Sequence, residues 1–423
     1  MHPITRSAVK MAALVTVASL AVSLPVLIAL NTHTWFLDGR FYADIGQALA
    51  AGKGYQEPHG FFPGRPTIGR LPLWPFLESI PLRLWHRDPM AVVQLTAWAI
   101  HGVSVFGVAL LTWLVSGVRR RMVLAGLIVG LWPGAMTTIL AGNVEPCSAA
   151  VLSVGTVLIC LGDANVLWGA ALLSLMPLTR ANFVILPFCV AAILLFARYR
   201  SPGRELPIRA SVNRLMLAAA IYYVPTGVWM ARNYAVSGAF PLLAAEEGQS
   251  FSGNYNLPSA TPGRYFGRWV GMDLVPGEER QFDLSRRMSE AELDRYYRAR
   301  GMWFIRQHWK LLPQLVAGRI IWSLRPQWFS VPARGYSWYR YWEWIWRAAL
   351  YCAAILVVRR KRPALANAFE VILSATTIIT VATVVLFFGA ERYLYQLTVL
   401  LAAWVFATAF TEPAPPPNAP IHA

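Results

Sequence analysis

Two carboxylates stand beside apolar runs of the chain, where solvation alone does not explain them. Asp38 follows the first apolar run in WFLDGRFYADIGQALAAGKGY, and Glu145 precedes a later one in AGNVEPCSAA. An accessible aspartate has a reference pKa of about 3.9, so it is ionised at neutral pH and can take a proton from a bound hydroxyl. Structural roles compete, because Asp38 could cap a helix and Glu145 could complement a helix dipole. The pair could be acid and base, base and orienting group, or two metal ligands.

Arginines occupy similar positions. Arg232 ends an apolar run in WMARNYAVSGAFP, Arg392 opens the last run in GAERYLYQL, and Arg180 lies in a break at LTRAN. A guanidinium suits phosphate because its planar fork donates two parallel hydrogen bonds. The competing role is contact with lipid headgroups at the interface. A charge within the bilayer costs about 2.5 to 3.5 kcal/mol on insertion scales, so several charges near one surface indicate a site.

Other catalytic motifs are missing from the sequence. No P-loop, dinucleotide-binding, zinc-protease or serine-hydrolase motif occurs in a usable context. The histidines His33, His59, His86, His101 and His308 show no metal spacing, and we expect them to be solvated or interfacial. Pairing of His33 or His59 with the first-loop site is the alternative. The four scattered cysteines fit small buried hydrophobes. We expect no cofactor, and a divalent metal is not indicated.

The composition identifies an integral membrane protein. Of 423 residues, 56% are hydrophobic and 14% charged, with a mean hydropathy of +0.44. The net charge of +17 comes from short clusters between apolar runs, such as 119 to 121, 198 to 204 and 359 to 362. That pattern fits the positive-inside rule better than a nucleic-acid-binding face.

Hydropathy predicts an all-α polytopic fold with about ten transmembrane helices. The expected spans are residues 11 to 30, 90 to 116, 122 to 139, 146 to 162, 165 to 178, 181 to 196, 213 to 231, 344 to 358, 367 to 388 and 393 to 411. Arg6 and Lys10 precede the first span, which places the N-terminus in the cytoplasm. A cleaved signal peptide is the competing interpretation.

Two decisions set the topology. Residues 165 to 196 would make a helix of about 48 Å, too long for a core of about 30 Å, so we expect two helices that meet at a break near Pro177. The proline-rich stretch 71 to 85 is expected to lie at the interface rather than span. All basic clusters then fall inside, and Asp38 and Glu145 fall near the outer surface. In the alternative topology, residues 71 to 85 span the membrane and residues 165 to 196 form one helix. The basic cluster 119 to 121 then moves outside and Glu145 moves inside, which violates the charge rule.

The chain divides into four predicted parts: a transmembrane core at 1 to 232 with a first outer loop at 31 to 89, an outer segment at 233 to 343, C-terminal transmembrane helices at 344 to 411, and a disordered tail at 412 to 423. Within the outer segment, Ser289 and Glu292 predict a capping box that opens a helix running to about His308. The aromatic run 336 to 346 is expected to be an interfacial belt, with a sugar-stacking platform as the alternative.

These motifs together resemble the GT-C glycosyltransferases, above all glycosyltransferase family 39, which includes protein O-mannosyltransferases and the lipid A aminoarabinose transferase. The resemblance covers about residues 10 to 410. It is carried by D-x-x-x-Y and ALAAGKGY after the first span, GNxEP, TRAN, WxxRNYxxxGxFP, GNYN and ERYL. Each motif is weak alone, and their order makes the set specific.

The resemblance implies transfer of a sugar from a polyprenyl-phosphate donor to a glycolipid, polysaccharide or protein acceptor at the outer face of a bacterial inner membrane. It makes Asp38 the catalytic base of an inverting reaction and Glu145 the second acid, with Arg180, Arg232 and Arg392 on the phosphate. The implied substrate contacts are Tyr42, Asp44, Asn233, Tyr234, Asn254, Glu391 and Tyr393. Gly39 departs from the Asp-Glu pair of protein mannosyltransferases, so a glycolipid or polysaccharide acceptor is favoured.

Three other readings stay open. A secondary transporter of a polar or lipid-linked solute would place its charges at the midplane of related halves, and no internal repeat is evident. A membrane scaffold gives no reason for carboxylates and arginines to share one depth. A GT-C relative without activity would keep the same residues. The sequence identifies neither the sugar, the polyprenyl length nor the acceptor.

Overall fold

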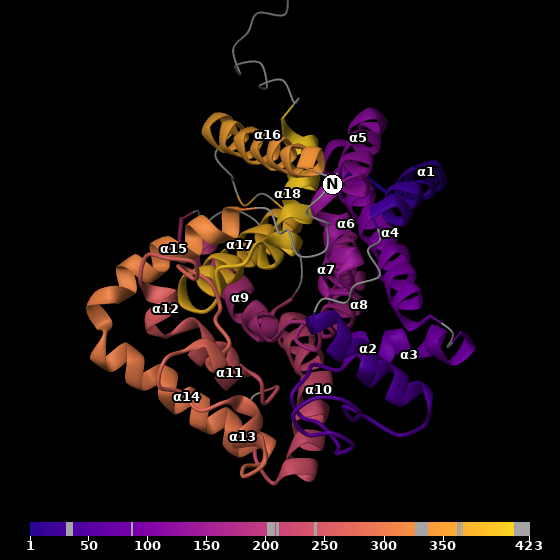
Figure 1. Ribbon diagram of the computed structural model, residues 1–423. Helices are drawn as coiled ribbons and strands as arrows, with labels where there is room; N and C mark the ends of the chain where they lie inside the picture. Colours follow the sequence, from indigo (N-terminus) through magenta and orange to yellow (C-terminus); the bar gives the residue numbers. More distant parts are fainter. Residues whose placement is uncertain are drawn as a thin grey trace, which may run out of the picture.

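The computed structural model describes residues 1–30, 37–85, 88–200, 208, 211–240, 243–325, 337–361, 365 and 367–409. The predicted disordered tail, 412 to 423, lies outside these residues. Helices make up most of the described residues, and the β-structure in this part of the chain is limited to one isolated bridge between Gln56 and Pro66. Helices of the first 160 residues lie on one side of the molecule in Figure 1, and α17 and α18 separate them from the orange helices of residues 247 to 324.

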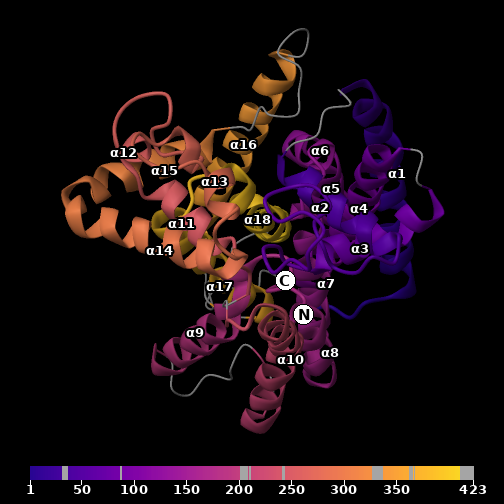
Figure 2. The ribbon, with the colours of Figure 1, turned by 60° about the horizontal axis from the view of Figure 1, so that its bottom comes forward.

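Each predicted span coincides with helical structure. The helices are α1 (Arg6–Leu30), α4 (Pro89–Ser116), α5 (Arg119–Gly130) with α6 (Pro133–Leu140), α7 (Glu145–Cys160), α8 (Val166–Leu173), α9 (Leu186–Arg200), α10 (Val212–Ser237), α16 (Ser337–Lys361), α17 (Ala368–Leu386) and α18 (Tyr395–Thr408). In the described residues, four helical stretches are long and apolar enough to cross a membrane, by length and composition. The number is five if α5 and α6, bent by 41°, form one span. Figure 2 shows α9 and α10 extending from the same side of the molecule.

One predicted span is much shorter than expected. The stretch 165 to 178 contains α8, which has only eight residues. Such a helix is about 12 Å long, against a hydrocarbon core of about 30 Å. Turns occupy the residues after it, and the backbone of Arg180 is extended before α9 begins. The break between the two helices is therefore present, but α8 cannot cross a bilayer by itself.

Small residues let the membrane helices approach closely. A Cβ atom on Gly107 of α4 would come within 2.6 Å of Ser153 Oγ on α7, and one on Gly126 of α5 would come within 2.6 Å of Val15 on α1. Glycines at such positions are typical of helix packing in membranes, where van der Waals contact replaces the hydrophobic effect. Bulkier side chains at these positions would force the helices apart.

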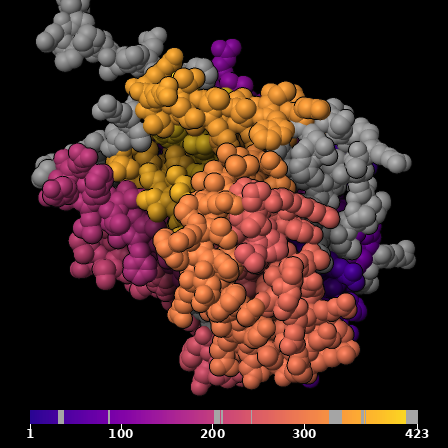
Figure 3. All heavy atoms as spheres, turned by 60° about the vertical axis from the view of Figure 1, so that its left-hand side comes forward, coloured from indigo at the N-terminus to yellow at the C-terminus, as the bar shows by residue number. Residues whose placement is uncertain are grey.

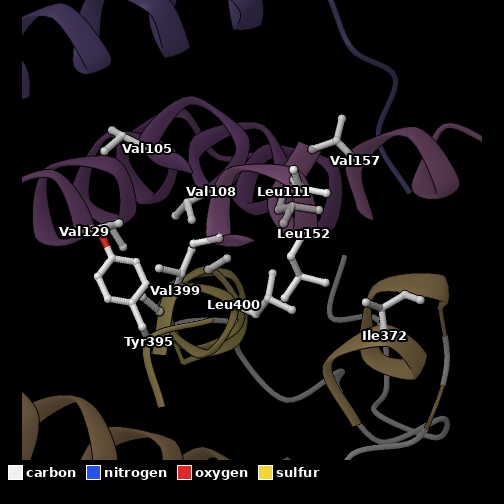
Figure 4. Packing of buried hydrophobic residues seen from close by; sticks show 14 of the residues in the cluster. Val105, Val108, Leu111, Val129, Leu152, Val157, Ile372, Tyr395, Val399 and Leu400 are labelled. Carbon is white, nitrogen blue, oxygen red and sulfur yellow. The ribbon is translucent and has the colours of Figure 1, made fainter. Parts of the chain in front are cut away.

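Helix α18 packs into the centre of the core. Figure 4 shows Val399 and Leu400 of α18 against Val108 and Leu111 of α4, with Leu152 of α7 beside them. All five side chains are buried. They fix the position of the turn that precedes α18.

His101 differs from the sequence expectation. It lies in α4 and is fully buried. Its Nε2 is 3.1 Å from the carbonyl oxygen of Val129, and its Nδ1 is 2.9 Å from the hydroxyl of Tyr395. The prediction of a solvated or interfacial histidine is wrong here, because hydrogen bonds from two other helices satisfy both ring nitrogens.

Two helices form most of the first loop. Helix α2 (Leu37–Ala50) packs along α3 (Leu73–Leu84), which occupies the stretch predicted to be interfacial. The indole of Trp74 is buried and donates to the carbonyl oxygen of Gly142 at 3.1 Å. This contact fixes the first loop against the turn that leads to Glu145.

The long segment, defined here as residues 243–325, is mostly helical. Its helices are α11 (Glu247–Asn254), α12 (Leu257–Ala260), α13 (Gln281–Ser285), α14 (Glu290–Gln307) and α15 (Leu312–Leu324). The capping box of Ser289 and Glu292 is present and His308 is the C-cap, so that prediction is confirmed. Figure 3 shows the side chains of this segment forming one continuous face of the molecule.

Candidate functional site

Asp38 lies in the first turn of α2, next to the turn before α7. A Cβ atom on Gly39 would come within 1.9 Å of the carbonyl oxygen of Ala141, so only glycine permits this approach. Glu145, at the start of α7, is fully buried. The close contact of the two backbones brings both carboxylates to one place.

Arg392 lies between the two carboxylates. It belongs to the short 3-10 helix η5 (Glu391–Leu394), between α17 and α18. Its Nη1 donates to Asp38 Oδ2, and its Nε lies 3.9 Å from Glu145 Oε1. One guanidinium therefore contacts side chains from the first loop and from α7.

Arg180 completes the pairing of Glu145. Its Nη2 donates to Glu145 Oε1, and its guanidinium lies 4.6 Å from the ring centroid of Tyr393. Only 12% of the Arg180 side chain is exposed. The structure thus brings together Asp38, Glu145, Arg180 and Arg392, which are separated by up to 354 positions in the chain.

Sequence reasoning missed two members of this site. Arg70 Nη1 lies 3.5 Å from Asp38 Oδ1 and 2.5 Å from Glu246 Oε2. The guanidinium of Arg70 also lies over the rings of Phe41 and Tyr42, at 4.7 and 5.5 Å. The available signal for Arg70 was its position directly before the stretch 71 to 85, in the loop that carries Asp38. Glu246 follows the motif that ends at Pro241 and gave no signal of its own.

We call these six residues the charged cluster: Asp38, Arg70, Glu145, Arg180, Glu246 and Arg392. Burial raises the pKa of Asp38, but the charges of Arg392 and Arg70 outweigh it and hold the pKa at about 2. Burial raises the pKa of Glu246 to about 7, against the opposing effect of Arg70. At neutral pH Asp38 is therefore ionised, whereas Glu246 lies close to its titration point.

A further carboxyl with a raised pKa lies near the cluster in the first loop. The side chain of Glu57 is buried, and burial raises its pKa to about 8, with Glu246 and Glu290 adding to the effect and Arg70 opposing it. Glu290 of α14 accepts from the Thr67 hydroxyl at 2.7 Å and from the Ile68 backbone N–H at 2.8 Å. The long segment therefore holds the part of the first loop that leads to Arg70.

Arg232 lies outside the charged cluster. Its Nη1 donates to the carbonyl oxygen of Thr67 and to Asn233 Oδ1, at 2.5 and 3.1 Å, and its Nη2 donates to the carbonyl oxygen of Tyr55. The guanidinium also lies over the rings of Tyr55 and Trp229. Among the ion pairs of the described residues, none joins Arg232 to Asp38 or Glu145. Through these contacts Arg232 holds the first loop.

The remaining predicted substrate contacts fall into two groups. Tyr42 and Tyr393 line the charged cluster through their rings. The others make contacts elsewhere: Asp44 pairs with Arg40 at 3.9 Å, Asn233 donates to Leu243, Tyr234 stacks on Phe240, Asn254 donates to Ser250, and Glu391 faces Arg347 at 3.5 Å. The residues of this second group therefore contact other residues of the protein rather than the charged cluster.

The chain matches no protein-family profile and no curated protein. Among solved structures, it is similar to the oligosaccharyltransferase of Archaeoglobus fulgidus in complex with zinc and sulfate, with a TM-score of 0.52 and 15% identity over 95% of this chain and 48% of that chain. The apo form gives a TM-score of 0.51 and 12% identity over 93% and 50%. ArnT from Cupriavidus metallidurans bound to undecaprenyl phosphate gives 0.43 and 16% over 93% and 77%.

The chain spans about half the length of the oligosaccharyltransferase structures that it matches. Identity at this level establishes the fold alone. The shared fold is the all-helical membrane fold of GT-C glycosyltransferases, as the sequence predicted.

One of these structures contains zinc, so the side chains of the charged cluster bear on metal binding. Three carboxylates face three arginines, so positive charge already compensates the negative charge at the site. In the described ranges no group of three or more His, Cys, Asp or Glu side chains could hold a metal ion. As arranged here, these residues do not fit a divalent cation.

Proposed function

We propose that this protein is a membrane glycosyltransferase that moves a sugar from a polyprenyl phosphate to an acceptor hydroxyl at the outer face of a bacterial inner membrane. The observation that carries the proposal is the pairing of Asp38 with Arg392 and Arg70. A carboxylate beside two guanidinium groups, which suit phosphate, can accept a proton where a phosphate departs. The GT-C fold supports the same class of reaction.

The reaction is an in-line displacement at the anomeric carbon. Asp38 accepts the proton of the acceptor hydroxyl, the acceptor oxygen bonds to the anomeric carbon, and the bond to the phosphate oxygen breaks with inversion. The electron pair of that bond stays on the lipid phosphate. General base catalysis contributes about a hundred- to ten-thousandfold in rate, and the proposal needs no metal because a phosphate is already a good leaving group.

The arginines stabilise the departing phosphate. Arg392 and Arg70 pair with Asp38, and Arg180 pairs with Glu145. Each donor directed at a developing oxyanion is worth about a hundred- to thousandfold in kcat. A donor phosphate that takes up Arg392 also weakens its pairing with Asp38. The pKa of Asp38 then rises, so the carboxylate becomes a stronger base when the donor is bound.

The close approach of Gly39 to Ala141 bears on the acceptor. An acidic residue at position 39 would collide with the Ala141 backbone. Protein mannosyltransferases carry an Asp-Glu pair at this place, and position 39 of this chain has no space for the second acid. This supports a glycolipid or polysaccharide acceptor rather than a protein hydroxyl.

The test is transfer of radiolabelled sugar from a panel of polyprenyl-phosphate sugars by membranes that contain wild-type protein, Asp38→Asn or Asp283→Asn. Asp283 is exposed on α13 and serves as the matched control. We expect label in product with wild type and the control, and none with Asp38→Asn at equal expression. Equal transfer by all three proteins would remove Asp38 from the mechanism. Failure of wild type with every donor, in membranes with endogenous acceptors, would contradict the proposed activity.

A further inference from the structure

A second group of buried charges lies on the far side of η5. Glu343 and Arg347 form an ion pair one turn apart on α16, and Arg347 Nη2 lies 3.5 Å from Glu391 Oε2. The side chains of all three residues are about 5% exposed. A buried ion pair contributes little net stability compared with a hydrophobic replacement, so its presence calls for another explanation.

Glu343 connects this group to the kink between α5 and α6. It accepts from the Gly134 backbone N–H at 2.7 Å and from the Trp132 indole at 3.2 Å. A Cβ atom on Gly134 would come within 2.5 Å of the same carboxylate. Trp132 also stacks on Trp346, with ring centroids 5.1 Å apart. Glu343 therefore has a fixed position, and Arg347 is fixed by it.

Glu391 and Arg392 are consecutive residues whose side chains face different partners. Glu391 faces Arg347, whereas Arg392 contacts Asp38 and Glu145. Because the backbone of η5 joins them, holding Glu391 on one side sets the direction of Arg392 on the other. Gly389, two residues earlier, lies against Arg319 of α15, with 2.5 Å between its Cβ position and the Arg319 Cα. The turn is thus held from α15 and from α16.

We infer that Glu343, Arg347 and Glu391 form a positioning group that orients Arg392 toward the donor phosphate. The inference rests on the proposed function, and it makes Glu391 a positioning residue rather than a substrate contact. A binding group accelerates the reaction most when it is already held in the correct position. A misplacement of about 1 Å can cost about a hundredfold in rate.

The decisive variant replaces all three charges at once: Glu343→Gln, Arg347→Met and Glu391→Gln. Removing a buried ion group completely avoids the unpaired charge that a single substitution would leave, so we expect the protein to fold with a melting temperature close to that of wild type. The matched control is Glu278→Gln with Arg300→Met, which neutralises an ion pair of the long segment.

The readouts are the binding of undecaprenyl phosphate to purified protein in detergent and the kinetic constants for donor and acceptor. We expect the triple variant to bind the lipid phosphate about tenfold more weakly and to lose kcat, because a small displacement of a binding group can cost up to about a hundredfold in rate. The acceptor KM and the behaviour of the control should stay unchanged. Arg347→Lys keeps the charge without the planar fork, so its lipid-phosphate binding and kcat should lie between those of wild type and the triple variant.

The possible results distinguish the positioning role from general loosening and from failure of the proposed function. A folded triple variant with wild-type lipid binding and kcat would overturn the positioning role. Equal changes in donor and acceptor KM would also overturn it, because general loosening affects both substrates. If the triple variant does not fold, the same comparison is made with Arg347→Lys. Wild-type protein that binds no polyprenyl phosphate would instead contradict the proposed function itself.

Discussion

The α-carbon of Gly39 lies so close to the carbonyl oxygen of Ala141 that a methyl group would have no space. We predict that Gly39→Ala pushes α2 away from the turn before α7 and separates Asp38 from Glu145. Overpacking of this kind costs about 1 to 3 kcal/mol, and transfer activity should fall more than stability. Gly227→Ala on α10, where the added carbon meets nothing within 4 Å, is the control and should be tolerated. Thermal unfolding and sugar transfer by the two variants check the prediction.

Arg70 should matter as much as Arg392, although only Arg392 stood out in the sequence. Arg70→Met removes a cation from Asp38 and leaves Glu246 unpaired, so we expect kcat to fall by about a hundred- to thousandfold. Arg70→Lys should recover part of the loss, because lysine keeps the charge but cannot form the two-pronged contact. Arg287→Met, in an exposed ion pair, controls for the loss of one positive charge. Wild-type kinetics for Arg70→Met would exclude a role at the site.

Arg232 offers a test between two roles. If it holds the first loop, Arg232→Met frees the carbonyl groups of Tyr55 and Thr67, and limited proteolysis should cleave faster within residues 55 to 67. If it binds donor phosphate, as the sequence predicted, the donor KM should rise while the cleavage pattern stays that of wild type. From the contacts of Arg232 with the first loop, we expect faster cleavage.

The pH dependence of stability should reveal Asp38. Its pKa is lowered in the folded protein, from 3.8 to about 2, so its stabilising effect is complete above about pH 4 and is lost as the pH falls toward 2. The loss amounts to about 2 kcal/mol for a shift of this size. Unfolding of wild type and Asp38→Asn in detergent should therefore converge at low pH. Parallel curves across this window would argue against the ion pairs.

The effect of Glu57 on folding stability should depend on pH in the opposite direction to that of Asp38. Its pKa is raised from 4.5 to about 8, so the folded state favours the protonated form and stability is lost as the pH rises from about 4.5 to 8. Glu57→Gln cannot ionise, so it should be more stable than wild type at pH 8 and similar to it at pH 4. Equal stability of the two proteins at pH 8 would contradict a buried, protonated Glu57.

Helix positions were predictable because apolar runs and end signals are local. The capping box of Ser289 and Glu292 and the break before Arg180 were both visible in the sequence. The length of α8 was not, because an apolar composition does not tell a short helix followed by turns from a complete span.

The pairing of side chains was harder to predict. Asp38 and Arg392 could be placed at one surface, but the partnership of Arg70 with Glu246 depends on how the long segment lies over the first loop. The opposite directions of Glu391 and Arg392 depend on the turn geometry of η5, which has no periodic signature. Such features follow from tertiary contacts, and these leave no local pattern.

Arg319 of the long segment binds the end of α17, a membrane helix. Its guanidinium donates to the carbonyl oxygen of Val385, near the end of α17, and to that of Asn254 in α11, each at 2.8 Å. Tyr255 donates its hydroxyl to the carbonyl oxygen of Leu386. The last carbonyl groups of a helix need such partners. The long segment therefore cannot be exchanged alone. A chimera that takes this segment from a relative must also take the matching end of α17.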